Sequence, residues 1–247
     1  MRDESLENVI KITKEMLQTK YPLAEFAFLA GSIIRGEGTK YSDLDIVIIF
    51  ENLPNAYRES FYFQGFPVET FVHTPETLNY FFDLDIAEKV PSLAVMVSEG
   101  IVIPNETDLS RNLKKLANEI LSNPLQITED EIRGFQYWIT DLIDDIREPR
   151  SKIELTASGT RLYEALSNCY FRINEMWMAK SKSIPRSLQK HSPEFYKEFT
   201  ESFEELFTLG KTERIIKLAE NMLAPHGGFM FDGVKLDAPK EWRKPIK

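Results

Sequence analysis

The sequence predicts an α+β protein, in which a small mixed β-sheet with flanking helices is followed by an all-α helical bundle. The first hundred residues contain short apolar runs bounded by glycine or acidic residues, which is typical of strands buried on both faces. From about residue 109 onward, apolar residues recur every three or four positions, as in the helices of a bundle. We therefore expect one domain over residues 1–107 and a second over residues 108–247.

Composition limits the classes of protein that this chain can belong to. The chain has 247 residues, of which 43% are hydrophobic and 28% charged, so it can bury a real core and should be globular. Its net charge of −9 argues against a protein that grips long nucleic acid, which needs a basic surface. The single cysteine, Cys169, excludes an internal disulfide. Without a signal peptide or an apolar run near the ~20 residues of a membrane helix, we expect a cytoplasmic protein with no membrane partner.

The segment from Phe26 to Phe50 contains the first candidate site. A strand over 26–30 is broken by a Gly-Ser pair, and a second apolar run over 46–50 follows an Asp-Leu-Asp sequence. Side chains alternate along a strand, so Asp43 and Asp45 should point to the same side. Two adjacent carboxylates repel each other, and a cation between them removes that repulsion. Carboxylate oxygens favour Mg²⁺ or Mn²⁺ as that cation.

Two further features extend this site. Gly31 allows close backbone approach, Ser32 adds a hydroxyl and an N–H, and a helix starting after them would direct free N–H groups at an anion. Glu69 lies in the middle of a predicted strand over 66–72, where a charge is costly unless it is paired or metal-bound. If that strand is a neighbour of the Asp43–Asp45 strand, three carboxylates can hold two Mg²⁺ ions.

This constellation resembles the signature of the nucleotidyltransferase superfamily to which DNA polymerase β belongs. Gly31-Ser32, ten intervening residues, Asp43-Leu44-Asp45 and a later Glu69 occur in the order of that signature, and the resemblance covers about residues 25–105. It implies that the glycine and serine hold a nucleoside triphosphate and that the three carboxylates bind two Mg²⁺ ions. A hydroxyl of the acceptor would then attack the α-phosphate, with pyrophosphate as leaving group.

Two cations flank the Gly-Ser pair. Arg35 fits the pattern of small bacterial members of the superfamily and could neutralise the β- and γ-phosphates. Lys40 could do the same, although an ordinary surface lysine is an equally good interpretation.

The two-domain layout resembles the aminoglycoside and lincosamide nucleotidyltransferases. This implies transfer of AMP from ATP, or of another nucleotide, to a hydroxyl of a small molecule by a monomer or homodimer. In the bundle, Asp141, Asp144 or Asp145 could act as general base or bind a cationic acceptor, but a solvated acidic face is the simpler interpretation of each. The alternative is a non-catalytic nucleotide-binding or antitoxin-like module, against which the complete carboxylate trio argues.

Several local predictions remain to be tested by the structure. Residues 51–65 are expected to form a loop with some strand near 61–63, and a strand is expected over 100–104. Arg186 and His191 have the spacing of a motif of HEPN-type ribonuclease toxins, but they fall in a predicted loop and we assign them no role. Helices are predicted over 4–19, 74–89, 91–97, 109–121, 128–148, 153–181, from 192, and over 211–223, with a small hairpin near 229–236.

Overall fold

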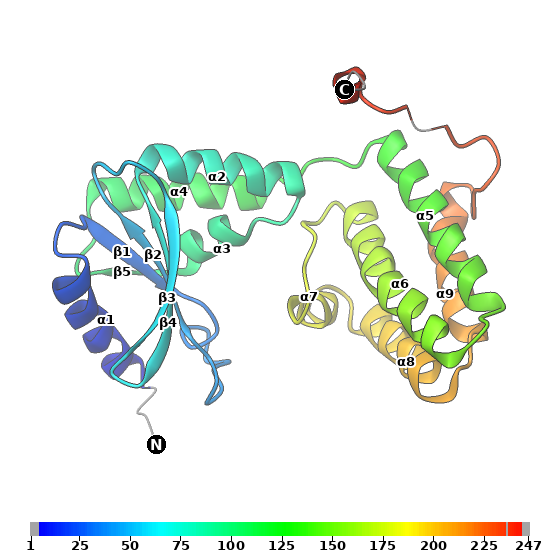
Figure 1. Ribbon diagram of the computed structural model, residues 1–247, viewed down its shortest axis with the longest axis horizontal. Coiled ribbons are helices and arrows are strands. Elements are labelled where there is room, and N and C mark those ends of the chain that lie inside the picture. Colours follow the sequence, from blue (N-terminus) through cyan, green and yellow to red (C-terminus); the bar gives the residue numbers. More distant parts are fainter. Residues whose placement is uncertain (1–4, 236, 244–247) are drawn as a thin grey trace, which may run out of the picture. The chain divides into compact units, whose positions relative to one another are not determined.

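The computed structural model describes residues 5–235 and 237–243, and its contacts divide the chain into two compact units, Met1–Leu125 and Gln126–Lys247 (Figure 1). This division differs from the predicted boundary after residue 107 by one helix. Helix α4 (Asp108–Ser122) packs against α3 (Ser92–Glu99), and its Leu113 and Ala117 are buried in the core of the first unit. Apolar burial therefore ties α4 to the sheet domain.

The first unit is built on a mixed sheet, as predicted, and this sheet has five strands. Its strands have the order β3-β4-β2-β1-β5. Strands β2 and β4 are parallel, and the other neighbouring pairs are antiparallel. The strands are β1 (Phe26–Ala30), β2 (Leu44–Ile49), β3 (Tyr57–Phe63), β4 (Phe66–His73) and β5 (Ile101–Ile103). Strand β1 is buried along its whole length, which explains why its sequence is continuously apolar.

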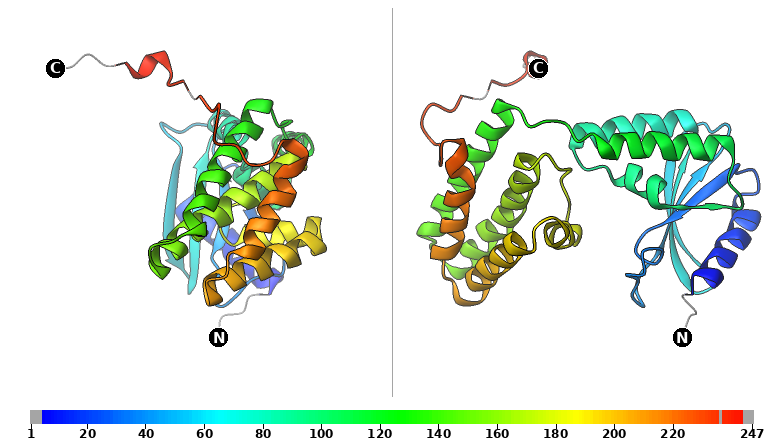
Figure 2. Two further views of the ribbon diagram at one scale, coloured as in Figure 1. Left: turned by 90° about the vertical axis from the view of Figure 1, so that its right-hand side faces the viewer. Right: turned by 180° about the vertical axis from the view of Figure 1, so that it is seen from behind.

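Helices cover both faces of this sheet (Figures 1 and 2). Alternate residues of β1 and β2, such as Ala27 and Ile46, pack with α1 (Leu6–Lys20) on one face. The intervening residues, such as Phe28 and Val47, pack with α2 (Pro75–Glu88), α3 and α4 on the other. The strand period of two thus distributes the buried apolar side chains of β1 and β2 between two cores.

Side-chain caps fix where α1 and α2 begin. Ser5 accepts a hydrogen bond from the backbone N–H of Asn8 at 3.4 Å and caps α1. Thr74 and Thr77 form a reciprocal capping box before Pro75, the first residue of α2. The helices were predicted to begin at 4 and 74, within two residues of the observed starts at Leu6 and Pro75.

The region predicted as a loop over 51–65 contains the full strand β3. It pairs antiparallel with β4 through a two-residue turn, Gln64-Gly65, in which both residues have positive φ (48° and 82°). Such turns match the twist of a hairpin, but they are usually signalled by Asn-Gly or Asp-Gly. The predicted strand near 61–63 is therefore confirmed, but it begins earlier, at Tyr57, so the prediction of a loop over 57–60 was wrong.

The second unit is a helical bundle, as predicted. Its helices are α5 (Glu129–Arg147), α6 (Lys152–Ile173), α7 (Ser183–His191), α8 (Pro193–Leu209) and α9 (Glu213–Leu223), with short 3-10 turns at Ala224–His226 and Lys240–Trp242. Their apolar stripes form one continuous core. No helix among the described residues is long and apolar enough to cross a membrane.

Three details of this unit differ from the prediction. Helix α6 ends at Ile173 rather than near 181, because Glu175 adopts a left-handed conformation (φ 54°). Arg186 and His191 lie in helix α7 rather than in a loop. The part of the predicted hairpin that the structure describes, residues 229–235, forms turns and irregular backbone, and position 236 lies outside the described residues.

Candidate metal and nucleotide site

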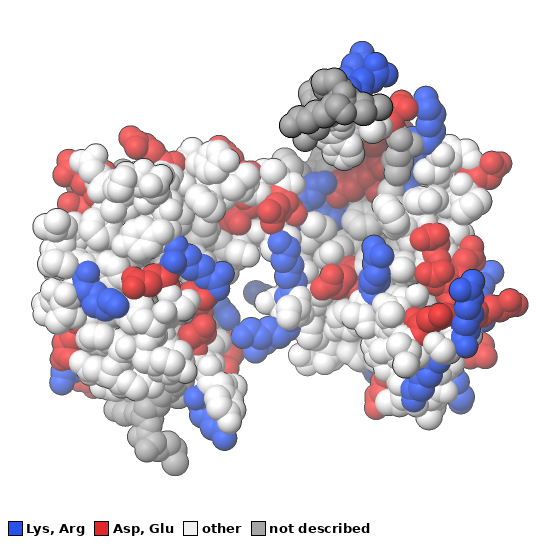
Figure 3. All heavy atoms as spheres, viewed as in Figure 1, with Lys and Arg blue, Asp and Glu red and all other residues white. Residues whose placement is uncertain are grey.

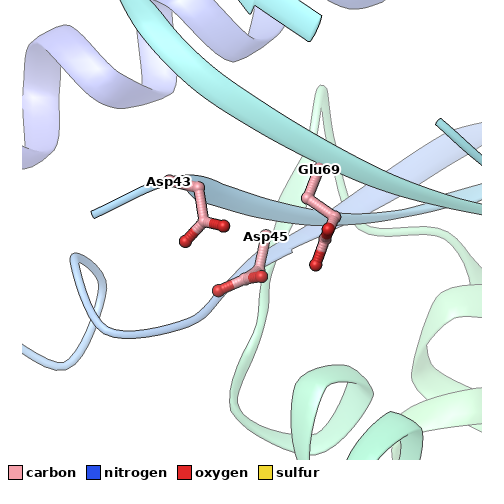
Figure 4. Close-up of side chains that lie close together, drawn as sticks. All are labelled: Asp43, Asp45 and Glu69. Carbon is pink, nitrogen blue, oxygen red and sulfur yellow. The ribbon is translucent and has the colours of Figure 1, made fainter. Parts of the chain in front are cut away.

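Two neighbouring parallel strands bring three carboxylates together. The register of β2 and β4 places Asp45 directly beside Glu69, and Asp43 lies two residues before Asp45, so all three point to the same side. In Figure 4 their carboxylates converge from the two strands. One carboxylate oxygen of each residue lies within 4.8 Å of the others, and all three side chains are half-buried. The structure thus groups the residues that the sequence predicted as a cluster.

This cluster has the chemistry of a divalent-cation site. Three like charges at such distances repel one another in a half-buried setting, where water screens them incompletely. Their donor atoms are all carboxylate oxygens, the type preferred by Mg²⁺ and Mn²⁺. The side chains present therefore fit a divalent metal.

Gly31 lies against this cluster. Strand β1 pairs antiparallel with β2 so that Ala30 is opposite Asp45, and the next residue turns away with φ 88°. A Cβ on Gly31 would lie 2.1 Å from Oδ2 of Asp45. Both the left-handed backbone and the close approach therefore require glycine here.

The chain after Gly31 forms turns, so the helix that would have supplied free N–H groups is absent from residues 32–43. The backbone N–H of Glu37 donates to the Ser32 carbonyl at 2.8 Å. Ser32 Oγ donates to Ser42 Oγ at 3.2 Å, which joins the start of this loop to the residue before Asp43. The loop therefore holds Ser32 next to the carboxylate strand.

Arg35 is held by two carboxylates. It donates to Glu99 Oε1 at 2.5 Å and to Glu37 Oε2 at 3.2 Å. Burial acts to lower the pKa of Arg35, but the charge of Glu99 and the contacts with Glu37 outweigh it and raise that pKa. The same Glu99 oxygen accepts a hydrogen bond from the Gly31 N–H at 3.3 Å. Glu99 thus accepts hydrogen bonds from both groups that we expect to bind phosphate, the Gly31 N–H and the Arg35 guanidinium.

The other predicted residues are not members of this three-carboxylate cluster. The Lys40 ammonium lies 4.9 Å from the centre of the Tyr41 ring on an exposed loop, and its role stays a prediction. Asp141 and Asp145 are exposed on α5, where they line a cavity of about 140 Å³ with Trp138. Asp144 is exposed on the same helix and pairs with Arg147 at 3.7 Å.

Sequence reasoning missed three residues at this site. Arg58 and Ser60 are on β3, on the same side of the sheet as Glu69, and both donate to Glu69 Oε1, Ser60 at 3.3 Å. Glu99 ends α3. Arg58 and Ser60 could have been found only by recognising β3 as a strand of the hairpin. Glu99 has no sequence signal, because its contact with Gly31 spans 68 positions of the chain.

Comparison with protein families agrees with this geometry. Residues 9–166 match the model of the nucleotidyltransferase domain. Because this match covers more than half of the chain, the protein belongs to the nucleotidyltransferase domain family.

Comparison with individual proteins adds less. No curated protein gives a significant match. Among solved structures, a nucleotidyltransferase-like protein from Exiguobacterium sibiricum is 15% identical with a TM-score of 0.45, and the alignment covers 88% of this chain and 75% of that one.

Proposed function

We propose that this protein transfers a nucleoside monophosphate from a nucleoside triphosphate, in the first instance AMP from ATP, to a hydroxyl group of a small molecule. The observation that carries this proposal is the cluster of Asp43, Asp45 and Glu69 beside Gly31. Family membership supports nucleotidyl transfer as the reaction class. The donor base and the acceptor are the parts that we propose.

The reaction forms one bond and breaks one. The acceptor oxygen attacks the α-phosphorus, a new P–O bond forms, and the bond to the bridging oxygen of the β-phosphate breaks to release pyrophosphate. The acceptor proton passes to a base, for which a carboxylate of this chain is the candidate. Gly31 and Ser32 provide close backbone approach and a hydroxyl for the triphosphate, and Arg35 provides a cation on the same loop.

Asp43, Asp45 and Glu69 would hold the divalent metal, for which we propose two Mg²⁺ ions. When bound, such ions neutralise the charge on the attacking and leaving oxygens of a phosphoryl displacement. The three carboxylates could hold the ions without rearrangement of the backbone, because the register of β2 and β4 already places Asp45 beside Glu69. A rigid sheet is a better platform for such precision than a loop.

The charge of the chain guides the choice of acceptor. A net charge of −9 opposes long nucleic acid and favours a small, cationic, hydroxyl-bearing acceptor, for which an aminoglycoside-like molecule is our example. On the face of the molecule seen in Figure 3, acidic and basic side chains of the described residues are interspersed rather than gathered into one basic field. Asp141 and Asp145 beside Trp138 are candidates for contact with such an acceptor.

Melting temperature measured with each of the four common nucleoside triphosphates, with and without Mg²⁺, tests the donor half of the proposal. A ligand that binds only the native protein raises its melting point. We expect a Mg²⁺-dependent rise for one triphosphate, and its loss in Asp45→Asn. The matched control is Asp83→Asn, which removes an exposed aspartate from α2 and should leave the rise unchanged.

The same triphosphate then allows acceptors to be screened by pyrophosphate release. Release that depends on the acceptor and on Asp45 supports an enzyme. Binding of nucleotide with no release for any hydroxyl-bearing acceptor would favour the alternative, a nucleotide-binding module without catalysis. Absence of a shift for every triphosphate would contradict the proposal as a whole.

A further inference from the structure

Arg58 places a positive charge directly on one of the three clustered carboxylates. Its guanidinium donates to Glu69 Oε1 and forms an ion pair with it. The register of the hairpin pairs Arg58 with Phe71, and its guanidinium lies 5.1 Å from the centre of the Phe71 ring. The arginine is thus fixed on the same side of the sheet as Asp43, Asp45 and Glu69.

This ion pair conflicts with metal binding. Glu69 Oε1 receives both Arg58 and Ser60, so this oxygen already has two donors. A cation held by the three carboxylates would compete with the guanidinium for Glu69 and would be repelled by its charge. The Arg58 side chain is 61% exposed, so its guanidinium can regain water when it leaves Glu69, and Glu69, 19% exposed, would then have the cation as its partner.

A displaced Arg58 has a second anion available when a nucleotide is present. Its stem is anchored on β3 and its guanidinium lies over Phe71, so it stays beside the carboxylate cluster. A triphosphate bound through metal at that cluster brings phosphate oxygens to the same side of the sheet. The planar guanidinium can donate two hydrogen bonds to a phosphate, which a lysine ammonium cannot do in the same geometry.

We propose that Arg58 is a substrate-binding residue with two alternative anionic partners, Glu69 in the metal-free protein and a phosphate of the donor once metal is bound. This inference rests on the proposed function, because it takes a metal-bound triphosphate as the ligand. It makes Arg58 a competitor of the metal and a partner of the nucleotide. Removal of Arg58 should therefore strengthen the binding of metal and weaken the binding of nucleotide.

The test measures two dissociation constants on the full chain by calorimetry. The first is for Mn²⁺ alone, and the second is for the triphosphate that most stabilises the wild type, in the presence of saturating Mn²⁺. For Arg58→Ala we expect Mn²⁺ to bind more tightly, by roughly three- to tenfold, because a neighbouring positive charge is gone. We expect the triphosphate to bind more weakly, by roughly tenfold, because a charge-assisted contact is lost.

Two further variants separate charge from geometry and position. Arg58→Lys keeps the charge, so it should bind Mn²⁺ nearly as the wild type does and the triphosphate more weakly. Lys20→Ala is the matched control, because Lys20 pairs with Glu59 at 3.7 Å and lies over Phe61 on the opposite face of the same hairpin. It should change neither constant.

Unchanged or weaker Mn²⁺ binding by Arg58→Ala would overturn the competition, and unchanged triphosphate binding would overturn the phosphate contact. Either result alone rejects the proposal. If the wild type binds Mn²⁺ and triphosphate in a manner that depends on Asp45, such a result leaves the proposed function standing. If the wild type binds neither, both the proposed function and the role of Arg58 fail.

Discussion

The two units of this protein each contain a group of charged side chains that are at least partly buried, and the two groups differ in their balance of charge. In the first unit three carboxylates of like charge converge, half-buried, on one side of a sheet. In the second unit Arg172, with a fully buried side chain, donates to Glu131 Oε1 at 2.8 Å and to the Met176 carbonyl at 3.1 Å. One group is compensated within the fold, and the other keeps an excess of negative charge.

This difference distinguishes a structural role from a functional one. A buried ion pair with its hydrogen bonds made fixes the elements that carry it, here α5, α6 and the segment after α6. An excess of like charge works against folding and is explained when a ligand of opposite charge completes it. The carboxylate cluster, and not the buried arginine, is therefore the candidate site.

The largest effect that we expect comes from breaking the compensated pair. Arg172→Met removes a fully buried guanidinium and its ion pair with Glu131, and we expect a loss of about 3–5 kcal/mol in the free energy of unfolding, measured with urea. The double variant Arg172→Met, Glu131→Gln removes the uncompensated charge and should recover part of that loss. A single variant as stable as the wild type would contradict a structural role for this pair.

His73 provides an intermediate case, a buried titratable group that stays neutral. It ends β4, 3% exposed, with Nδ1 3.3 Å from Thr77 Oγ1. Burial lowers the pKa of His73 from 6.5 to about 4. The unfolded chain therefore takes up a proton near its ordinary pKa while the folded protein does not, so stability is complete above that pKa and is lost as the pH falls toward about 4.

The pH dependence can be measured against a variant that does not titrate. Between about pH 7.5 and about pH 5 we expect His73 to account for a loss of about 2 kcal/mol in the free energy of unfolding. In His73→Gln that part of the pH dependence should disappear. If the wild type and the variant lose the same stability over this range, the histidine is not held neutral by burial.

Much of the carboxylate site could be predicted from sequence because it depends on short-range pattern. The predicted apolar runs at 26–30 and 46–50 correspond to the buried strands β1 and β2, and the alternation along β2 fixes the side to which Asp43 and Asp45 point. The parallel pairing that brings Glu69 beside Asp45 could be stated only as a condition, because no local sequence pattern indicates which strands are neighbours.

The parts that sequence did not predict depend on unusual turns and long-range contacts. Only the end of β3, near 61–63, was predicted, because its exposed, charged residues and the Gln64-Gly65 turn lack the usual signals of a hairpin, and Arg58 was missed with the rest of the strand. The end of α6 was placed about eight residues too late, because its apolar pattern continues through Met176 while the backbone turns at Glu175. Tertiary context overrides propensity at both places.

The smallest expected effect is the sharpest test of the comparison between the two charged groups. Asp45→Asn removes one of three like charges, so in metal-free buffer it should leave the free energy of unfolding unchanged or raise it by up to about 1 kcal/mol. Removal of a charge from the second unit, as in Arg172→Met, should do the opposite. The control Asp83→Asn should stay within about 0.5 kcal/mol of the wild type.

Added Mg²⁺ should then reverse the order of stability. The wild type gains stability from a ligand that binds only its native state, whereas Asp45→Asn, with one carboxylate fewer, gains little. As the Mg²⁺ concentration rises, the wild type should therefore change from the less stable to the more stable of the two proteins. This change of order is expected only if the like charges of Asp43, Asp45 and Glu69 serve to bind a cation. A variant that is less stable than the wild type by more than about 1 kcal/mol without metal would mean that Asp45 is held in place by the fold, as Arg172 is.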